Sequence, residues 1–213
     1  MRMYLSSYKF GNHKDALKEL ATGVERVAII MNALDFGDQD RVTQTVMGLK
    51  GEFSEMGFAA ERLDLRDYFG KEDSLREKMS EFGMVWVCGG NAFLLKRAYE
   101  QSGFGNILVE RLKEDSLVYA GFSAAVVVIT PTLRGAEIVD DPNVIVPLYK
   151  DEIDLNGLGL INYAVAVHYK SDHPESAAVD KYVEFCEKEN IPYKPLRDGE
   201  VIYINGAEEI ILK

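Results

Sequence analysis

A serine stands where a buried strand is expected to end, in the segment Tyr119 to Ala125 with the sequence YAGFSAA. The residues two before and two after it, Gly121 and Ala125, are small, as a tight strand-to-helix turn requires because the backbones nearly touch there. Such a turn holds the hydroxyl above the sheet and turns a helix N-terminus toward an oxyanion. Ser123 is therefore a candidate nucleophile. A side chain that merely caps the helix is the equally weighted alternative.

A second glycine-containing turn follows another apolar run, in the segment Val87 to Asn91 with the sequence VCGGN. Paired glycines let backbone N–H groups point into a site without a Cβ in the way. We expect the N–H groups of Gly90 and Ala124 to form an oxyanion hole, with an ordinary tight turn as the alternative. The segment lacks the third glycine of a dinucleotide fingerprint, so no nicotinamide cofactor is expected.

A nucleophilic serine needs a base, and the chain offers three histidines. His13 falls on an expected surface helix, and His173 falls in a polar loop. His168 ends the apolar run Tyr163 to Val167, and strand ends are where α/β sheets place their sites. His168 is the preferred base, with a hydrogen-bonded structural histidine as the alternative.

The base must be oriented by a third group, usually a carboxylate. The candidates are Asp198, which precedes a glycine, and Glu137, Asp140 and Asp141 in a loop. Spacing does not choose among them. The only cysteine near these motifs, Cys88, lies inside an apolar run without a basic neighbour, where a thiol is inert.

The elements that must position these residues alternate along the chain. Short apolar runs rich in β-branched residues indicate strands at 4–7, 26–31, 59–65, 84–88 and 117–121. Helical spacing of apolar residues indicates helices at 40–56, 71–82, 92–101 and 174–189. This alternation predicts a doubly wound α/β fold with a mostly parallel sheet and helices on both faces.

The last third of the chain departs from that alternation. Prolines and glycines punctuate residues 131–156, which indicates a long irregular segment. The dipeptide Asn205-Gly206 separates two apolar runs, 201–204 and 208–212, and this pattern predicts a C-terminal β-hairpin.

Length and charge limit the function classes. The 213 residues suit one domain, residues 1–213, and two cysteines are too few for a disulfide framework. The formal net charge of −11 and the absence of a Lys/Arg cluster argue against nucleic acid as a partner. We expect a cytoplasmic protein, because neither a leader nor a membrane-spanning run is found.

Three ordered motifs together resemble the peptidase E (aspartyl dipeptidase) family, within the wider flavodoxin-like, class I glutamine amidotransferase-like fold. They are the glycine turn 88–91, the serine turn 121–125, and the segment from Ile161-Asn162 to His168. The similarity extends over nearly the whole chain.

The resemblance implies a serine peptidase with Ser123, His168 and Asp198 as its triad. Asp198 matches the family's acid before the final hairpin, while Glu137 and Asp140 stay open as the acid between serine and histidine. The implied substrate is a small peptide, a dipeptide with N-terminal aspartate being one. We expect neither a metal nor another cofactor, since the sequence has no HExxH or paired-cysteine ligand set. We also expect no membrane partner, and a homodimer stays open as the assembly.

Two positions depart from the family pattern. Ala125 replaces a glycine, which strains the turn if φ must be positive there. Ala177 stands where the family carries an arginine suited to a substrate carboxylate, leaving Lys170 or Arg134 as substitutes. A binding protein without turnover and a hydrolase of non-peptide amides or esters are therefore the alternatives.

Overall fold

The centre of the computed structural model, which describes residues 1–152 and 154–213, is a seven-stranded sheet. Its strand order is β3-β2-β4-β5-β1-β8-β9; the first five strands are parallel, and the last two are antiparallel to their neighbours. The strands are β1 (Arg2–Ser6), β2 (Arg26–Ile30), β3 (Ala59–Arg62), β4 (Met84–Val87), β5 (Val118–Phe122), β8 (Val201–Asn205) and β9 (Glu208–Leu212). The mostly parallel α/β sheet expected from the sequence is confirmed.

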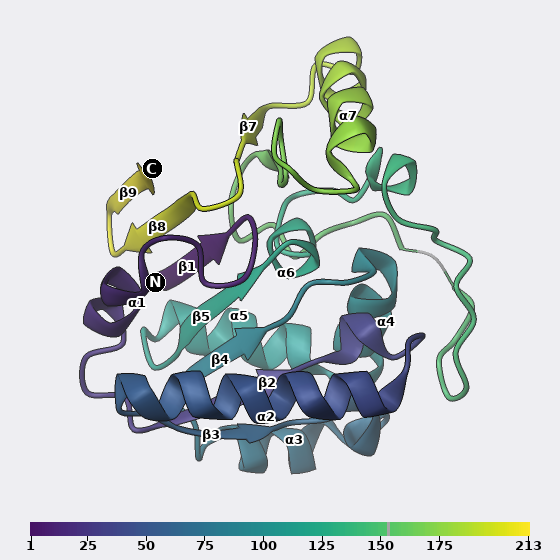
Figure 1. Ribbon diagram of the computed structural model, residues 1–213. Coiled ribbons are helices and arrows are strands. Elements are labelled where there is room, and N and C mark those ends of the chain that lie inside the picture. The colour runs from purple at the N-terminus through teal and green to yellow at the C-terminus, as the bar shows by residue number, and fades with distance from the viewer. Residues whose placement is uncertain (153) are drawn as a thin grey trace.

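The central strands are apolar on both faces because helices cover the sheet on both sides. In β2, Val27 and Ile29 pack on one face, while Ala28 and Ile30 pack on the other, and all four are fully buried. Helices α1 and α2 cover the first face, and α3 to α6 cover the second (Figure 1). The α-helices are α1 (Lys14–Leu20), α2 (Gln39–Met56), α3 (Glu72–Met79), α4 (Ala92–Ser102), α5 (Phe104–Lys113), α6 (Ala124–Val127) and α7 (Ser176–Lys188). The 3₁₀ helices are η1 (Asn32–Leu34), η2 (Leu65–Tyr68) and η3 (Ala136–Ile138).

Helix α2 shows how the sequence sets these elements. The Asp38 side chain accepts a hydrogen bond from the Asp40 N–H at the helix start, and Gly57 ends the helix with φ 93°. The helix buries four apolar side chains at helical spacing, Val42, Val46, Leu49 and Phe53. No helix within residues 1–152 and 154–213 is long and apolar enough to cross a bilayer.

A second, smaller sheet lies beside the main one, and the sequence did not predict it. Strand β6 (Ala164–Ala166) pairs in parallel with β7 (Tyr193–Pro195), apart from the seven-stranded sheet. Helix α7 packs on this pair through Val179, Tyr182 and Cys186 (Figure 1). The run that precedes His168 is therefore a strand as expected, but it belongs to the small sheet.

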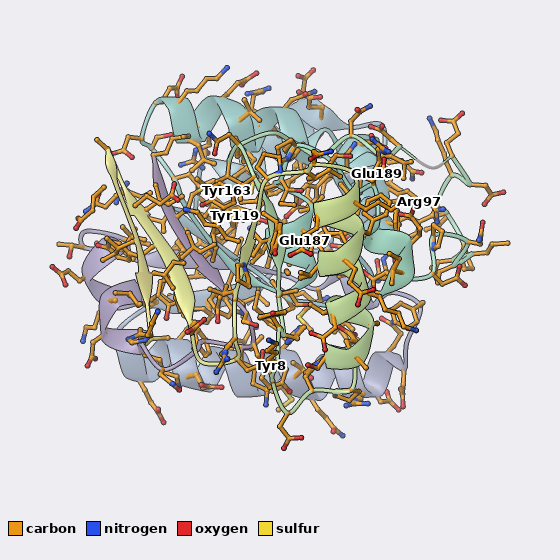
Figure 2. All side chains as sticks on the ribbon, turned by 90° about the horizontal axis from the view of Figure 1, so that it is seen from above. Tyr8, Arg97, Tyr119, Tyr163, Glu187 and Glu189 are labelled. Atoms are coloured by element: carbon orange, nitrogen blue, oxygen red, sulfur yellow. The ribbon has the colours of Figure 1, made fainter. Side chains whose placement is uncertain are left out.

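A buried side chain on α4 helps to anchor the described part of the irregular segment 131–156. The Arg97 guanidinium, on α4, donates hydrogen bonds to the backbone carbonyls of Pro142 (2.6 Å), Val144 (2.8 Å) and Glu152 (3.2 Å) (Figure 2). Backbone carbonyls without a strand or helix partner are thereby satisfied.

The chain ends in the predicted hairpin. Strands β8 and β9 pair with Asn205 opposite Glu208, and Gly206 in the turn has φ 64°, which glycine adopts without a steric cost. Strand β8 also pairs with β1, so the hairpin closes one edge of the main sheet.

Candidate active site

Ser123 lies in a strained turn between β5 and α6. Its φ and ψ are 54° and −115°, the first central position of a type II′ turn, which favours glycine. A non-glycine residue held there costs about 1–3 kcal/mol, and such strain concentrates at functional sites. Although Ser123 occupies the N-cap position, its side chain makes no capping hydrogen bond. The hydroxyl is therefore not used to cap the helix.

The residues around Ser123 must be small because neighbouring atoms leave no room for larger side chains. A Cβ on Gly121 would lie 2.5 Å from the Val87 carbonyl oxygen, and a Cβ on Gly89 would lie 2.8 Å from the Ser123 Cβ. Ala125 lies in α6 and has no positive φ, since the positive φ falls on Ser123 itself. The condition under which alanine would strain this turn, a positive φ, is therefore not met at Ala125.

His168 and Asp198 are joined at the ends of the small sheet. His168 follows β6, Asp198 follows β7, and the parallel pairing of these strands carries both residues to the same end. His168 Nδ1 lies 2.7 Å from Asp198 Oδ1, and the imidazole is buried, with 1% of the side chain exposed. Burial lowers the pKa of His168, an effect that the hydrogen bond to Asp198 opposes. The neutral imidazole is therefore favoured.

Ser7, at the end of β1, ties this pair to the main sheet. Its Oγ accepts a hydrogen bond from the His168 backbone N–H (2.8 Å), and its hydroxyl donates to Asp198 Oδ1 (2.8 Å). The Asp198 backbone N–H donates to Ser171 Oγ (2.8 Å). Both members of the pair are thus held by neighbours, as an orienting carboxylate must be.

A cleft of about 410 Å³ brings the nucleophile and base candidates together. Ser123, His168 and Gly90 line it, and so does Tyr8 (Figure 2), which packs edge-on against the His168 ring. Within the described residues, no hydrogen bond joins the Ser123 hydroxyl to the His168 ring. Catalytic hydrogen bonds often tighten only when substrate binds.

The two expected oxyanion donors lie beside Ser123. In the part of the chain that the structure describes, the N–H groups of Gly90 and Ala124 donate no hydrogen bond to another protein group. Gly90 has φ 141°, and a Cβ there would lie 2.4 Å from the Ala33 carbonyl oxygen. Only glycine therefore fits this position.

The other three candidate acids bond elsewhere. Asp141 is exposed and accepts the Asn143 N–H at 2.9 Å. Glu137 is exposed and accepts the Gly135 N–H at 2.8 Å. Asp140 accepts the Ala92 N–H at 2.8 Å, at the start of α4, and burial raises the pKa of Asp140 to about 7. Asp198 is thus the carboxylate that the structure places at His168 Nδ1.

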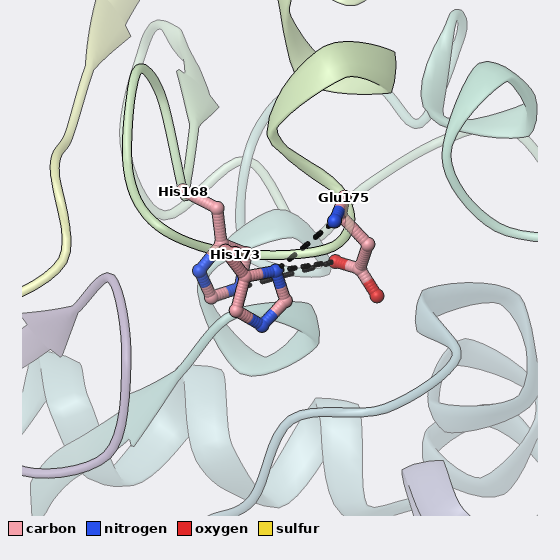
Figure 3. Close-up of side chains that lie close together, drawn as sticks. All are labelled: His168, His173 and Glu175. Carbon is pink, nitrogen blue, oxygen red and sulfur yellow. Dashed lines mark hydrogen bonds and ion pairs between the residues drawn. The ribbon is translucent and has the colours of Figure 1, made fainter.

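Two residues near the base were not assigned a role from the sequence. The His173 ring stacks on the His168 ring, with centroids 3.7 Å apart and planes 7° from parallel. Glu175 Oε2 lies 3.9 Å from His168 Nε2 and 4.0 Å from His173 Nδ1 (Figure 3). Sequence reasoning on this segment concerned Ala177 and gave no role to the carboxylate of Glu175.

These three residues have the donor types of a metal site, but their geometry opposes one. Their ligand atoms lie within 4.8 Å of one another. A metal ion binds imidazole in the plane of the ring, and the two stacked rings lie in nearly parallel planes. His173 Nδ1 also accepts the Glu175 N–H at 3.3 Å. One ring would have to rotate before both could bind a single ion.

The cations expected to replace the family's arginine are placed elsewhere. Arg134 forms an exposed ion pair with Glu189, and the Lys170 ammonium lies over the Tyr169 ring. Within the described residues, neither lines the cleft, so the suggestion that they serve a substrate carboxylate was wrong. The cleft instead carries the exposed cations Lys9 and Arg41.

Cys88 is not placed to act as a nucleophile. It is buried beneath the turn, and burial raises the pKa of its thiol to about 12. The expectation of an inert core thiol agrees with this environment.

An α/β sheet that presents a serine in such a turn is the architecture of the α/β serine hydrolases, and this chain is one of that class. The model of peptidase family S51 matches residues 5–212. The chain therefore belongs to peptidase family S51 and is a serine peptidase.

Several known proteins are similar to it. A Streptomyces coelicolor protein named peptidase E is 28% identical over 191 residues, which cover 87% of this chain and 70% of the relative. A Drosophila melanogaster protein named as a probable alpha-aspartyl dipeptidase is 26% identical, with 95% of this chain and 78% of the relative covered. The crystal structure of a candidate peptidase E from Listeria monocytogenes superposes with a TM-score of 0.77 at 21% identity, covering 100% of this chain and 98% of that chain.

Proposed function

We propose that this peptidase hydrolyses small peptides, dipeptides above all, through a triad of Ser123, His168 and Asp198. The observation that carries the proposal is the 2.7 Å hydrogen bond between His168 Nδ1 and Asp198, at the cleft that Ser123 also lines. A carboxylate at Nδ1 favours the tautomer that leaves Nε2 without a proton. That nitrogen is the one that accepts the serine proton.

The reaction then follows from the positions of these groups. His168 Nε2 takes the proton from Ser123 as Oγ attacks the scissile carbonyl. The N–H groups of Gly90 and Ala124 stabilise the oxyanion of the tetrahedral intermediate. His168 returns the proton to the leaving amine, and a water molecule, activated by the same imidazole, releases the acyl group from Ser123.

The size and charge of the cleft support a small peptide. Its volume of about 410 Å³ is in the range of small-ligand sites. Lys9 and Arg41 on its lining carry the charge that a peptide's terminal carboxylate requires. The names of the relatives favour a dipeptide as the substrate, and aspartyl dipeptides are one class that these names suggest for this chain.

The test is labelling and hydrolysis with a matched pair of variants. Wild type, Ser123→Ala and Ser54→Ala, an exposed serine on α2, are treated with a fluorophosphonate probe and then given a dipeptide library, with products read by mass spectrometry. We expect wild type and Ser54→Ala to label and to cleave, and Ser123→Ala to do neither.

Two outcomes contradict the proposal in different ways. Labelling of wild type without cleavage of any peptide would favour a hydrolase of non-peptide amides or esters. No labelling and no cleavage would favour a binding protein that has lost turnover.

A further inference from the structure

A second, smaller cavity also adjoins Ser123, and the exposed cations of the cleft do not line it. Its volume is about 30 Å³, and Ser123 and Glu175 line both spaces. The rest of its wall is mostly valine and alanine, contributed by α6, the segment around η3, the small sheet and α7. This cavity is therefore a small, mainly apolar space next to the candidate nucleophile.

The cavity has room for a small side chain only. A buried water needs roughly 10–15 Å³ of such space, so 30 Å³ corresponds to about two waters. Val139 and Val127, both partly buried, form part of the wall and limit its depth. Side chains of the size of alanine and serine match this volume, and those of leucine and larger residues exceed it.

The charged groups at the cavity are both acidic. Among the described residues, Asp140 and Glu175 line it, and no lysine or arginine does. An aspartate side chain inserted here would bring a third carboxyl group into an aliphatic wall without a cation, which is strongly unfavourable. The cavity chemistry therefore opposes the aspartate specificity that the family resemblance implies.

Glu175 is placed to bind the amino group of the same substrate residue. In a dipeptide, the α-ammonium group is separated from the scissile carbonyl carbon by the α-carbon alone, so it must lie close to Ser123 Oγ during attack. Glu175 lines both spaces beside Ser123, and its Oε2 lies 3.9 Å from His168 Nε2 (Figure 3). A carboxylate there pairs with an ammonium group at the reacting centre.

We propose that the 30 Å³ cavity receives the N-terminal side chain of the substrate and restricts it to small neutral residues, while the Glu175 carboxylate binds the α-ammonium group. This inference rests on the proposed function, because it takes Ser123 as the attacking group. It assigns a substrate class and a specificity-determining residue to that site.

The experiment measures kcat/KM on aminoacyl-coumarin amides of Ala, Val, Leu and Asp, and on N-acetyl-Ala. The enzymes are wild type, Glu175→Gln and Val139→Ala. Matched controls are Glu184→Gln, an exposed glutamate on α7, and Val24→Ala, a partly buried valine that lies outside both spaces. Labelling by the fluorophosphonate probe is recorded for every variant, since it reports the Ser123 chemistry independently of specificity.

For wild type, we expect kcat/KM on the Ala and Val substrates to exceed that on the Asp substrate by about 100-fold or more. We expect the same margin for Ala over N-acetyl-Ala. Glu175→Gln should lower kcat/KM on the Ala substrate, relative to that on N-acetyl-Ala, about 10- to 100-fold. Val139→Ala should raise the ratio of kcat/KM on the Leu substrate to kcat/KM on the Ala substrate about tenfold. The two control variants should behave as wild type.

Three results would overturn the inference while probe labelling keeps the proposed function intact. One is cleavage of the Asp substrate as fast as Ala at any pH from 5 to 8. Another is an equal fall of the Ala and N-acetyl-Ala rates in Glu175→Gln, which would mean that Glu175 acts only through His168. The third is an unchanged Leu-to-Ala ratio in Val139→Ala. If the wild-type protein did not react with the probe, the result would instead contradict the proposed function itself.

Discussion

Replacing Asp198 by asparagine is the sharpest test of the proposed triad. Asp198 Oδ1 accepts hydrogen bonds from His168 Nδ1 (2.7 Å) and from the Ser7 hydroxyl (2.8 Å). Asparagine keeps the size and the backbone bond to Ser171, so the fold should persist. A charge-assisted hydrogen bond is worth about 1.5–3 kcal/mol, which is a factor of roughly 10 to 150 in rate.

A change in the tautomer of His168 would lower kcat further. If the new amide donates to Nδ1, the imidazole proton moves to Nε2, and the ring no longer accepts a proton from Ser123. The combined loss in kcat should therefore be about 10³- to 10⁴-fold.

The assay compares kcat on the best dipeptide for wild type, Asp198→Asn and Glu137→Gln, with thermal unfolding as a check on folding. Glu137→Gln is the control, because Glu137 is exposed and bonds to the Gly135 N–H. A loss smaller than tenfold in a folded Asp198→Asn protein would refute the orienting role of Asp198. A loss of about 10³- to 10⁴-fold in kcat for Glu137→Gln would transfer the orienting role to Glu137.

Two further predictions concern pH. Because burial lowers the pKa of His168, kcat/KM should rise with pH along a limb whose midpoint lies below the ordinary histidine value of about 6.5; a midpoint above 7 in a pH–rate profile would contradict a buried neutral base. Burial raises the pKa of Asp140 from 3.8 to about 7, so the folded state binds a proton more tightly than the unfolded state, and its carboxylate costs stability progressively as pH rises from about 4 to about 7. Asp140→Asn keeps an acceptor for the Ala92 N–H. Relative to its effect at pH 4, this substitution should raise the free energy of unfolding at pH 8 by up to about 4 kcal/mol, measured by urea unfolding. Equal effects at both pH values would contradict this reasoning.

Local chemistry explains what the sequence predicted. The turn at Ser123 depends on contacts between near neighbours in space, and Gly121 and Gly89 have no room for a Cβ, so residue types alone pointed to it. The central strands β2, β4 and β5 of the main sheet were recognisable because they are apolar on both faces. The dipeptide Asn205-Gly206 has a backbone preference of its own, and its hairpin was predicted.

Long-range contacts explain what the sequence did not predict. Strand β6 has three residues, too few to indicate which strand it pairs with, so its place in the small sheet was not foreseen. Helix α5 begins directly after Gly103, which also ends α4, and the glycine pair 103 and 105 concealed it. The positions of Lys9, Arg41 and Glu175 on the cleft depend on packing between distant segments, and no local pattern marks them.

The bonds of Ser7 have a consequence for how this peptidase is made. Ser7 and Asp198 are 191 residues apart in the chain, yet the serine hydroxyl bonds to the carboxylate that contacts His168 Nδ1. During synthesis, the turn at Ser123 and its strands leave the ribosome long before Asp198 does. On the proposed triad, the nascent chain therefore has a serine without an oriented base until β7 and the residues after it have emerged. On that proposal, hydrolysis begins only when the last strands join the first.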